Sequence, residues 1–219
     1  VSSEKATSLA QLNLEAGKLA RQSTAYPLAI QCFESGIALL GQDAWELHYD
    51  LTYHLYLQLA SCEFIVQDDR SAKIYFSDLL NNAKKDIEKA EIYSAYISVL
   101  AYNDELNESV NIGIIALREL GIEISSGDID NKIENEFRIA RRYFKELELS
   151  NGTQKALNIH ELNNEFKKSI FNLLGETCGA AYYSSTGTGF DIFILITLKM
   201  VNLSFQDGHS WSSVFAYSN

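Results

Sequence analysis

NLEAGKLARQSTAYPLAIQCF, residues 13–33, carries the spacing that decides the fold of this chain. Within it, Gly17, Ala29 and Phe33 are separated by twelve and then four positions. The stretch LASCEFIVQDDRSAKIYF, residues 59–76, repeats both intervals at Ala60, Ala72 and Phe76, and a degenerate third copy follows at Ile97, Ser109, Gly113 and Ala116. A small residue at this spacing from an alanine and an aromatic residue suits two antiparallel helices whose axes cross closely. The sequence therefore predicts pairs of antiparallel helices that stack on one another.

Composition supports helices throughout. The chain has 219 residues, 47% of them hydrophobic, with a single proline and only 12 glycines. That length and apolar content suffice for a continuous core, and so few turn residues argue against a sheet with tight turns. We therefore expect an all-α fold.

Apolar residues at three- and four-residue steps predict where the helices lie. The expected helices are residues 3–22, 27–40, 43–66, 70–83, 86–102, 106–120, about 133–147, 158–181 and 190–205, with an incomplete last helix through Tyr217. In the first helix the apolar residues with this period are Leu9, Leu12, Ala16, Leu19 and Ala20, and Asp43 is expected to cap the third. The segment 190–205 is interpreted as a buried helix, too short and too interrupted by Lys199 to span a bilayer.

Charge and cysteine content narrow the classes of function. A net charge of −11 opposes binding to nucleic acid and to anionic membranes, because both need clustered Lys and Arg. Cys32, Cys62 and Cys178 are too few and too widely spaced for a disulfide framework or a zinc site. These features favour a cytoplasmic protein with protein partners and without membrane insertion. Because the chain starts without Met and stops within an apolar helical pattern, we expect it to be a piece of a longer protein.

The residue types that most often carry catalysis or bind metals show no catalytic or metal-binding pattern in this chain. The four histidines, His48, His54, His160 and His209, have neither metal-ligand nor triad spacing. Gly187-Thr188-Gly189 lacks the Lys of a phosphate-binding loop. We therefore predict no catalytic residue, metal or cofactor. The alternative is an all-helical enzyme with a site around His48, His54 and Asp50.

A binding surface is the remaining candidate, because stacked helix pairs curve and the first helix of each pair lines the inner face. The repeat register places on that face Leu14, Lys18, Arg21, His54, Gln58, Ser61, Glu91, Ser94, Ser98 and Tyr102. Their mixed polarity is typical of surfaces that bind protein. We expect an extended peptide or a neighbouring domain to lie there.

The spacing of Gly17, Ala29 and Phe33 resembles the tetratricopeptide repeat, with a longer period than usual. The resemblance implies a tetratricopeptide-like α-solenoid, with three helix pairs in residues 1–124 and further repeats in residues 125–219, truncated at the C-terminus, as one continuous superhelix. Members that grip a terminal carboxylate carry Lys, Asn and Arg on their inner helices, where this chain has Leu14, Gln58, Glu91 and Ala95. A chaperone-tail clamp is therefore not expected.

A second resemblance is carried by LNLEAGKLA (12–20) with STAY (23–26), and by LKMVNLS (198–204) with SVFAY (213–217). These segments resemble the helical repeats of large signalling proteins in which a serine/threonine-kinase-like domain and an AAA/STAND-type ATPase precede the repeats and a sensor histidine kinase often follows. The resemblance implies a non-enzymatic scaffold that relays between such modules. A stand-alone adaptor that binds a short linear peptide is the alternative.

Overall fold

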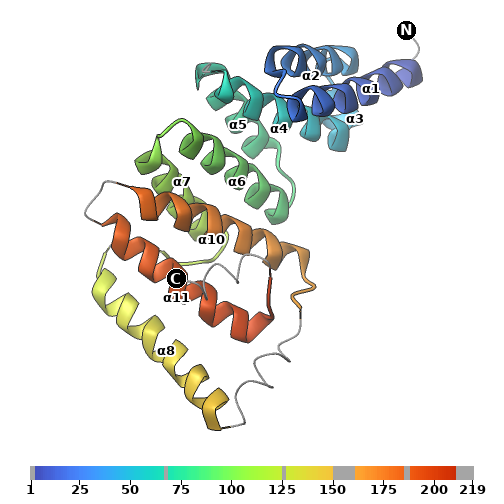
Figure 1. The fold of residues 1–219 in the computed structure, drawn as a ribbon. Helices are drawn as coiled ribbons and strands as arrows, with labels where there is room; N and C mark the ends of the chain where they lie inside the picture. Colours follow the sequence, from blue (N-terminus) through green and yellow to red (C-terminus); the bar gives the residue numbers. More distant parts are fainter. Residues whose placement is uncertain (1–2, 67–68, 125–126, 150–160, 185–187, 211–219) are drawn as a thin grey trace. The chain divides into compact units, whose positions relative to one another are not determined.

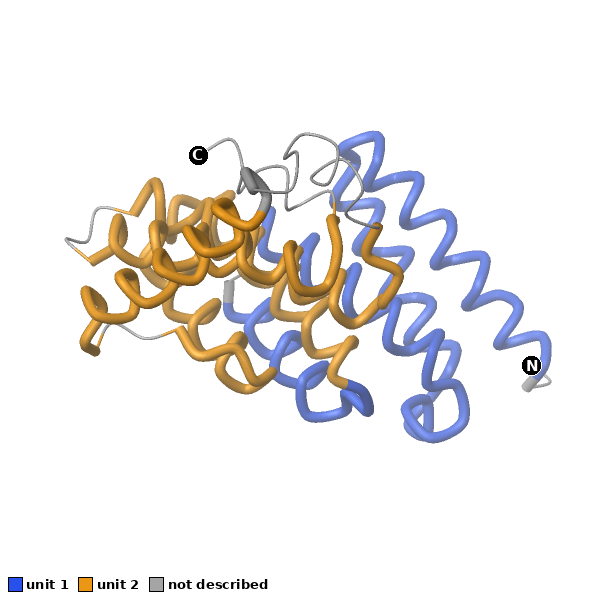
Figure 2. The backbone as a smooth tube through the Cα atoms, turned by 90° about the horizontal axis from the view of Figure 1, so that it is seen from below, with its two compact units in different colours: residues 1–85 blue, residues 86–219 orange. Residues whose placement is uncertain are grey.

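The chain is all-α in its computed structural model, as predicted (Figure 1). The structure describes residues 3–66, 69–124, 127–149, 161–184 and 188–210, and within these ranges it has ten helices and no strand. An isolated bridge joins Glu161 to His209. The chain divides into two compact units, residues 1–85 and 86–219 (Figure 2). The arrangement of all helices as one superhelix stays a prediction, and the predicted helix through Tyr217 lies outside the described residues.

The first unit contains five helices, of which consecutive long ones pack against each other. They are α1 (Ser3–Gln22), α2 (Tyr26–Leu40), α3 (Ala44–Leu47), α4 (Tyr49–Ile65) and α5 (Asp69–Asn82). Helix α2 packs on both α1 and α4, and α4 packs on α5. Two predicted boundaries follow from backbone chemistry: Pro27 lies in the first turn of α2, and Gly41 follows its last residue with φ of 79°.

The repeated small and aromatic positions form the core of this unit. Ala29, Phe33, Ala60 and Ala72 have no exposed surface, and Phe76 is almost fully buried. Gly17 is buried directly against Phe33: a Cβ added at Gly17 would lie 2.3 Å from Phe33 Cε1. The spacing in the sequence therefore marks a point where α1 and α2 approach too closely for any side chain on α1.

The buried face of α1 differs from the expected one. Leu12 and Leu19 are each 65% exposed, whereas Ala10 and Leu14 are buried. Of the apolar residues whose period predicted this helix, Ala20 is buried but Leu9, Leu12, Ala16 and Leu19 are exposed, because the close approach to Phe33 requires the face that carries Gly17. Residue volume at the contact outweighs average hydrophobicity in orienting this helix.

The helix expected over residues 43–66 is interrupted. Helix α3 ends at Leu47, His48 has non-helical backbone angles, and α4 begins at Tyr49. Asp43 precedes α3 but its side chain makes no capping hydrogen bond, so the predicted cap is wrong. Instead, the hydroxyl of Thr52 donates to the carbonyl of Ala44 at 3.0 Å and ties the two helices together.

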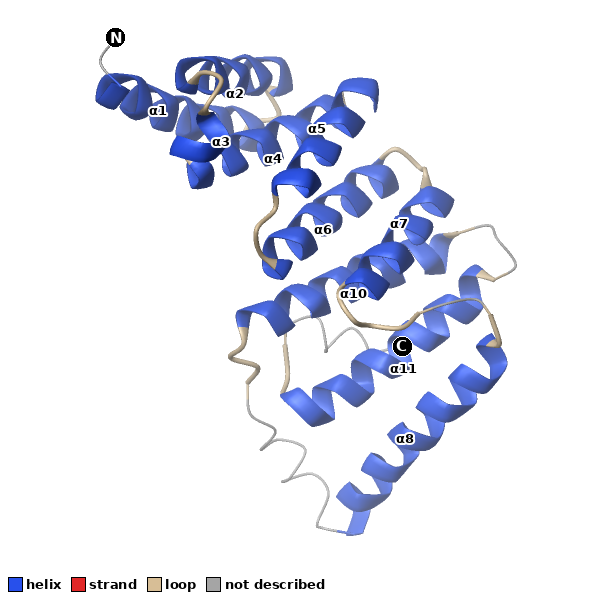
Figure 3. Cartoon of the chain, turned by 180° about the vertical axis from the view of Figure 1, so that it is seen from behind, coloured by secondary structure: helices blue, strands red, loops and turns tan. Residues whose placement is uncertain are grey.

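The second unit packs its helices in an order that differs from chain order. It contains α6 (Asp86–Tyr102), α7 (Leu106–Glu119), α8 (Ile129–Leu149), α10 (Glu165–Tyr183) and α11 (Gly189–Asp207). Helices α6 and α7 pack together, α10 packs on both, and α11 packs on α10. Helix α8 packs on α11, although it precedes α10 in the sequence (Figures 1 and 3).

Helix α10 begins later than expected. We predicted its start near residue 158, but it starts at Glu165, because the Asn164 side chain accepts a hydrogen bond from the Lys167 N–H and caps the helix. Leu162 lies before that cap and is buried. Its N–H donates to the carbonyl of His209 at 2.8 Å. This contact ties the segment before α10 to the residues that follow α11.

Among the described helices, α11 is long and apolar enough to cross a membrane by length and composition. By length and composition, the expectation that residues 190–205 are too short and too interrupted by Lys199 to span a bilayer is therefore wrong. Half of its apolar window is buried inside the structure, and core helices of soluble proteins pass the same test. Lys199 in this helix pairs with Glu136 of α8 at 2.8 Å, and the Asn202 amide donates to the same carboxylate at 2.7 Å.

Candidate functional site

The structure brings together two of the predicted surface residues of the first unit. Arg21, near the end of α1, donates a hydrogen bond to Gln58 Oε1 of α4 at 2.6 Å. Lys18 pairs with Glu15 on its own helix at 3.1 Å. His54 is exposed, one turn before Gln58, with its ring against Tyr53. These side chains form a polar surface over α1 and α4, and its role in binding stays a prediction.

Two residues placed on the same face are buried. Ser61 is 4% exposed and its hydroxyl donates to the Leu57 carbonyl of its own helix, while Leu14 belongs to the core. Both are therefore wrong as binding residues. Helix α4 is buried on every side from Leu59 to Phe64, because α2 and α5 both pack on it, so no face of this segment remains for a partner.

The predicted residues of the second unit lie along α6. Glu91 is exposed, and Ser94 and Ser98 are half-buried. The Ser98 hydroxyl donates to the Ser94 carbonyl at 2.9 Å, so it is already engaged within the helix. Tyr102, the last residue of α6, is exposed. Binding by this row stays a prediction.

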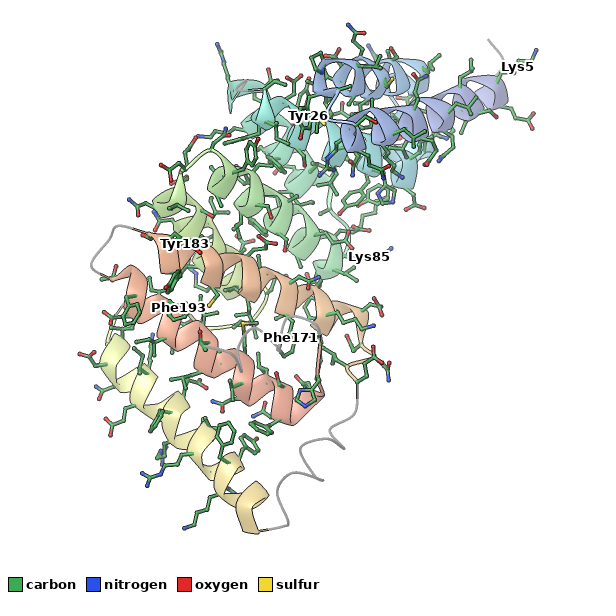
Figure 4. All side chains as sticks on the ribbon, viewed as in Figure 1. Lys5, Tyr26, Lys85, Phe171, Tyr183 and Phe193 are labelled. Atoms are coloured by element: carbon green, nitrogen blue, oxygen red, sulfur yellow. The ribbon has the colours of Figure 1, made fainter. Side chains whose placement is uncertain are left out.

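The sequence did not predict the cavity at the end of α6, which we term the Tyr183 groove. It has a volume of about 600 Å³, and its lining includes Asp104 and Leu106 from the α6–α7 turn and Gly175, Glu176, Gly179 and Tyr183 from α10. Tyr183, the last residue of α10, is 71% exposed (Figure 4). A second cavity of about 500 Å³ shares Asp104, Leu106 and Tyr183 with it.

Hydrogen bonds hold both walls of the Tyr183 groove. After α6 the Glu105 N–H donates to the Leu100 carbonyl and the Asp104 N–H to the Ala101 carbonyl, with Asp104 left-handed at φ of 65°. This is a Schellman turn, in which Asp is tolerated better than most residues. On the other side, the Ser184 hydroxyl donates to Asn107 Oδ1 at 2.6 Å and joins the end of α10 to the start of α7.

The sequence indicates one wall of this groove but not the other. Gly175, Gly179 and Tyr183 recur at four-residue steps, which places them on one face of α10. Nothing in the sequence shows that this face meets the α6–α7 turn, since the two segments are about seventy residues apart. The contact depends on α10 packing against α6 and α7.

The described residues show no reactive thiol at Cys62 or Cys178 and no cluster that could bind a metal ion. Burial raises the pKa of Cys62 and of Cys178 to about 11, so both thiols stay protonated and unreactive near neutral pH. Cys178 Sγ lies 3.5 Å from Thr197 Oγ1, inside the core between α10 and α11. Within the part of the chain that the structure describes, no group of three or more His, Cys, Asp and Glu residues could hold a metal ion.

Comparison with known proteins gives one distant similarity. No protein-family model matches the chain, and no solved structure matches it. Over 123 residues the chain is 28% identical to the "Hybrid signal transduction histidine kinase G" of Dictyostelium discoideum, a match that covers 52% of this chain and 4% of that kinase. The chain thus has weak similarity to a histidine kinase over half its length, and it spans a small fraction of that relative.

Proposed function

We propose that this chain is a non-enzymatic helical-repeat scaffold that mediates protein–protein or interdomain contacts within a multidomain ATPase and kinase signalling protein. In this role it works in the cytoplasm, without nucleic acid, cofactor or membrane insertion. Stacked tetratricopeptide-like helix pairs provide its surfaces.

The observation that carries the proposal is the repeated buried register. The aligned positions are buried in all three copies: Ala29, Phe33, Ala60, Ala72 and Phe76 in the first two, and Ile97, Ser109, Gly113 and Ala116 in the third. Helices built this way present rigid, exposed faces to partners, as repeat proteins do. The similarity to a signalling histidine kinase over a small part of its length agrees with a segment that connects other modules.

Calorimetric titration of the purified chain with Mg·ATP tests the non-enzymatic part. The expected result is no saturable binding up to about 1 mM ATP, the weak end of the affinities typical of enzyme sites. Saturable binding at or below that concentration would contradict a pure scaffold.

A stand-alone adaptor that binds a short linear peptide is the second candidate, and the half-buried polar surface at Lys18, Arg21 and Gln58 favours it. The reading frame on either side of residues 1–219 separates the two functions. A nucleotide-binding motif before the chain or a kinase motif after it would support the interdomain scaffold, whereas a frame with neither would favour the adaptor. Reversing the charges of Lys18 and Arg21 should then weaken peptide binding.

A further inference from the structure

The lining of the Tyr183 groove is acidic. Asp104 and Glu176 line the groove itself, and Glu105 and Glu108 line the adjoining cavity. Neither cavity has Lys or Arg among its described lining residues. The sequence has no Lys or Arg between Ala90 and Leu117 or between Ser169 and Leu198, so the segments that build the groove supply no cation of their own. Carboxylates collected in a concave surface focus a negative potential that attracts cations.

The centre of the groove is open because α10 presents glycine there. Gly175 and Gly179 lie one turn apart on the lining face, and a Cβ added at Gly179 would meet no atom within 4 Å. The surface of α10 at Gly179 is therefore open space. The volume is within the range of about 300–1,000 Å³ that is typical of ligand sites.

An aromatic ring stands where the two cavities meet. Tyr183 lines both cavities. The ring of Tyr182 contacts Tyr183 edge-on at 5.0 Å and also lies against Phe193 at 5.1 Å, so a buried residue of α11 supports the pair (Figure 4). An exposed ring beside carboxylates that line the same groove is the setting in which a planar guanidinium binds well, because it stacks on the ring and donates paired hydrogen bonds to a carboxylate.

From this arrangement we infer that the Tyr183 groove binds an arginine-bearing basic segment of a partner protein or domain. The inference rests on the scaffold function proposed above and specifies the chemical nature of the partner that the scaffold binds. Arginine is preferred to lysine because the ammonium group of lysine forms neither the paired hydrogen bonds nor the stacked contact.

Fluorescence anisotropy on the 219-residue chain tests the inference. The probe is a fluorescein-labelled peptide of four Gly-Arg-Ser repeats, compared with peptides in which Lys or Gln replaces Arg. The site variant is Asp104→Asn with Glu176→Gln, and Asn keeps the left-handed turn at position 104. The matched control is Asp130→Asn with Glu134→Gln, two exposed carboxylates on α8, which changes net charge equally. Circular dichroism verifies that each variant is folded.

The expected result is binding of the arginine peptide that the site variant weakens about tenfold, while the control variant leaves it unchanged. Replacement of Tyr183 by Leu should weaken binding about three- to fivefold, the usual effect of an exposed cation–π contact. The lysine peptide should bind more weakly, and the glutamine peptide should not bind.

Four results would overturn the inference. The first is that the arginine peptide does not bind, and the second is that the site and control variants weaken its binding equally. The third is that the lysine peptide binds as tightly as the arginine peptide and Tyr183→Leu has no effect. The fourth is that the chain self-associates in sedimentation and the site variant abolishes this self-association. The last would identify the occupant as a second copy, whose α8 carries exposed Arg138 and Arg141. Each can occur while the chain still binds no ATP, so failure of the groove is distinguishable from failure of the scaffold function.

Discussion

Gly113 of α7 and Gly179 of α10 lie in neighbouring helices of one unit, and the same substitution is expected to have opposite effects at the two positions. A Cβ added at Gly113 would lie 2.3 Å from Thr177 Oγ1 and 2.4 Å from its Cγ2, whereas a Cβ at Gly179 would meet no atom within 4 Å. Thr177 cannot move aside easily, because it is fully buried and its hydroxyl donates to the Leu173 carbonyl at 2.8 Å.

Two effects compete when either glycine becomes alanine. Replacing glycine in a helix interior stabilises it by about 0.8–1 kcal/mol. Adding a methyl group to a filled contact costs about 1–3 kcal/mol. Both apply at Gly113, so Gly113→Ala should lower the free energy of unfolding by about 1 kcal/mol. Only the first applies at Gly179, so Gly179→Ala should raise it by about 0.5–1 kcal/mol.

Urea unfolding followed by circular dichroism measures both variants against the unsubstituted chain. The double variant Gly113→Ala with Thr177→Ala identifies the cause, because Thr177→Ala removes the two atoms closest to the new methyl group. Its stability should exceed the sum of the two single effects by about 1 kcal/mol or more. If Gly113→Ala stabilises as much as Gly179→Ala and shows no such coupling, the close contact of α7 with α10 is refuted.

Gly17→Ala in the first unit should destabilise by about 1–2 kcal/mol in the same assay, with partial restoration by Phe33→Leu, because the added Cβ would lie 2.3 Å from the Phe33 ring; equal stability of Gly17→Ala and the parent would contradict this. Thr24 has a left-handed backbone with φ of 58°, so Thr24→Gly should raise the free energy of unfolding by about 1 kcal/mol, and a loss would count against the described turn. Burial raises the pKa of Cys62 and Cys178 from 9.0 to about 11, so these thiols ionise at lower pH in the unfolded chain than in the folded one. Stability should fall as pH rises from about 9 to about 11, and the loss should be smaller in a variant with alanine at both positions; equal pH dependence would exclude the thiols as its cause.

Several features of the fold could be predicted from local sequence. The spacing of Gly17, Ala29 and Phe33 identified residues that are all buried, since only a small residue fits where two helices touch. Pro27 and Gly41 predicted both ends of α2, because their backbone preferences are independent of tertiary contacts.

Other features depended on which segments meet. Periodicity predicted α1 from its apolar residues, but of these only Ala20 is buried, because Leu12 and Leu19 are more hydrophobic than Gly17 but too large for the contact with Phe33. The repeat register placed Ser61 on a binding surface, although α4 is covered on every side at that point.

The sequence by itself determined that the chain is helical, where most helices end and which small residues lie at close contacts, because these depend on backbone preferences and on neighbours a few turns apart. The tertiary structure alone decided that α8 packs on α11, and that Gly175, Gly179 and Tyr183 face the turn containing Asp104. A connection between helices costs only slightly more entropy as it lengthens, so periodicity carries little information about which distant helices pack together.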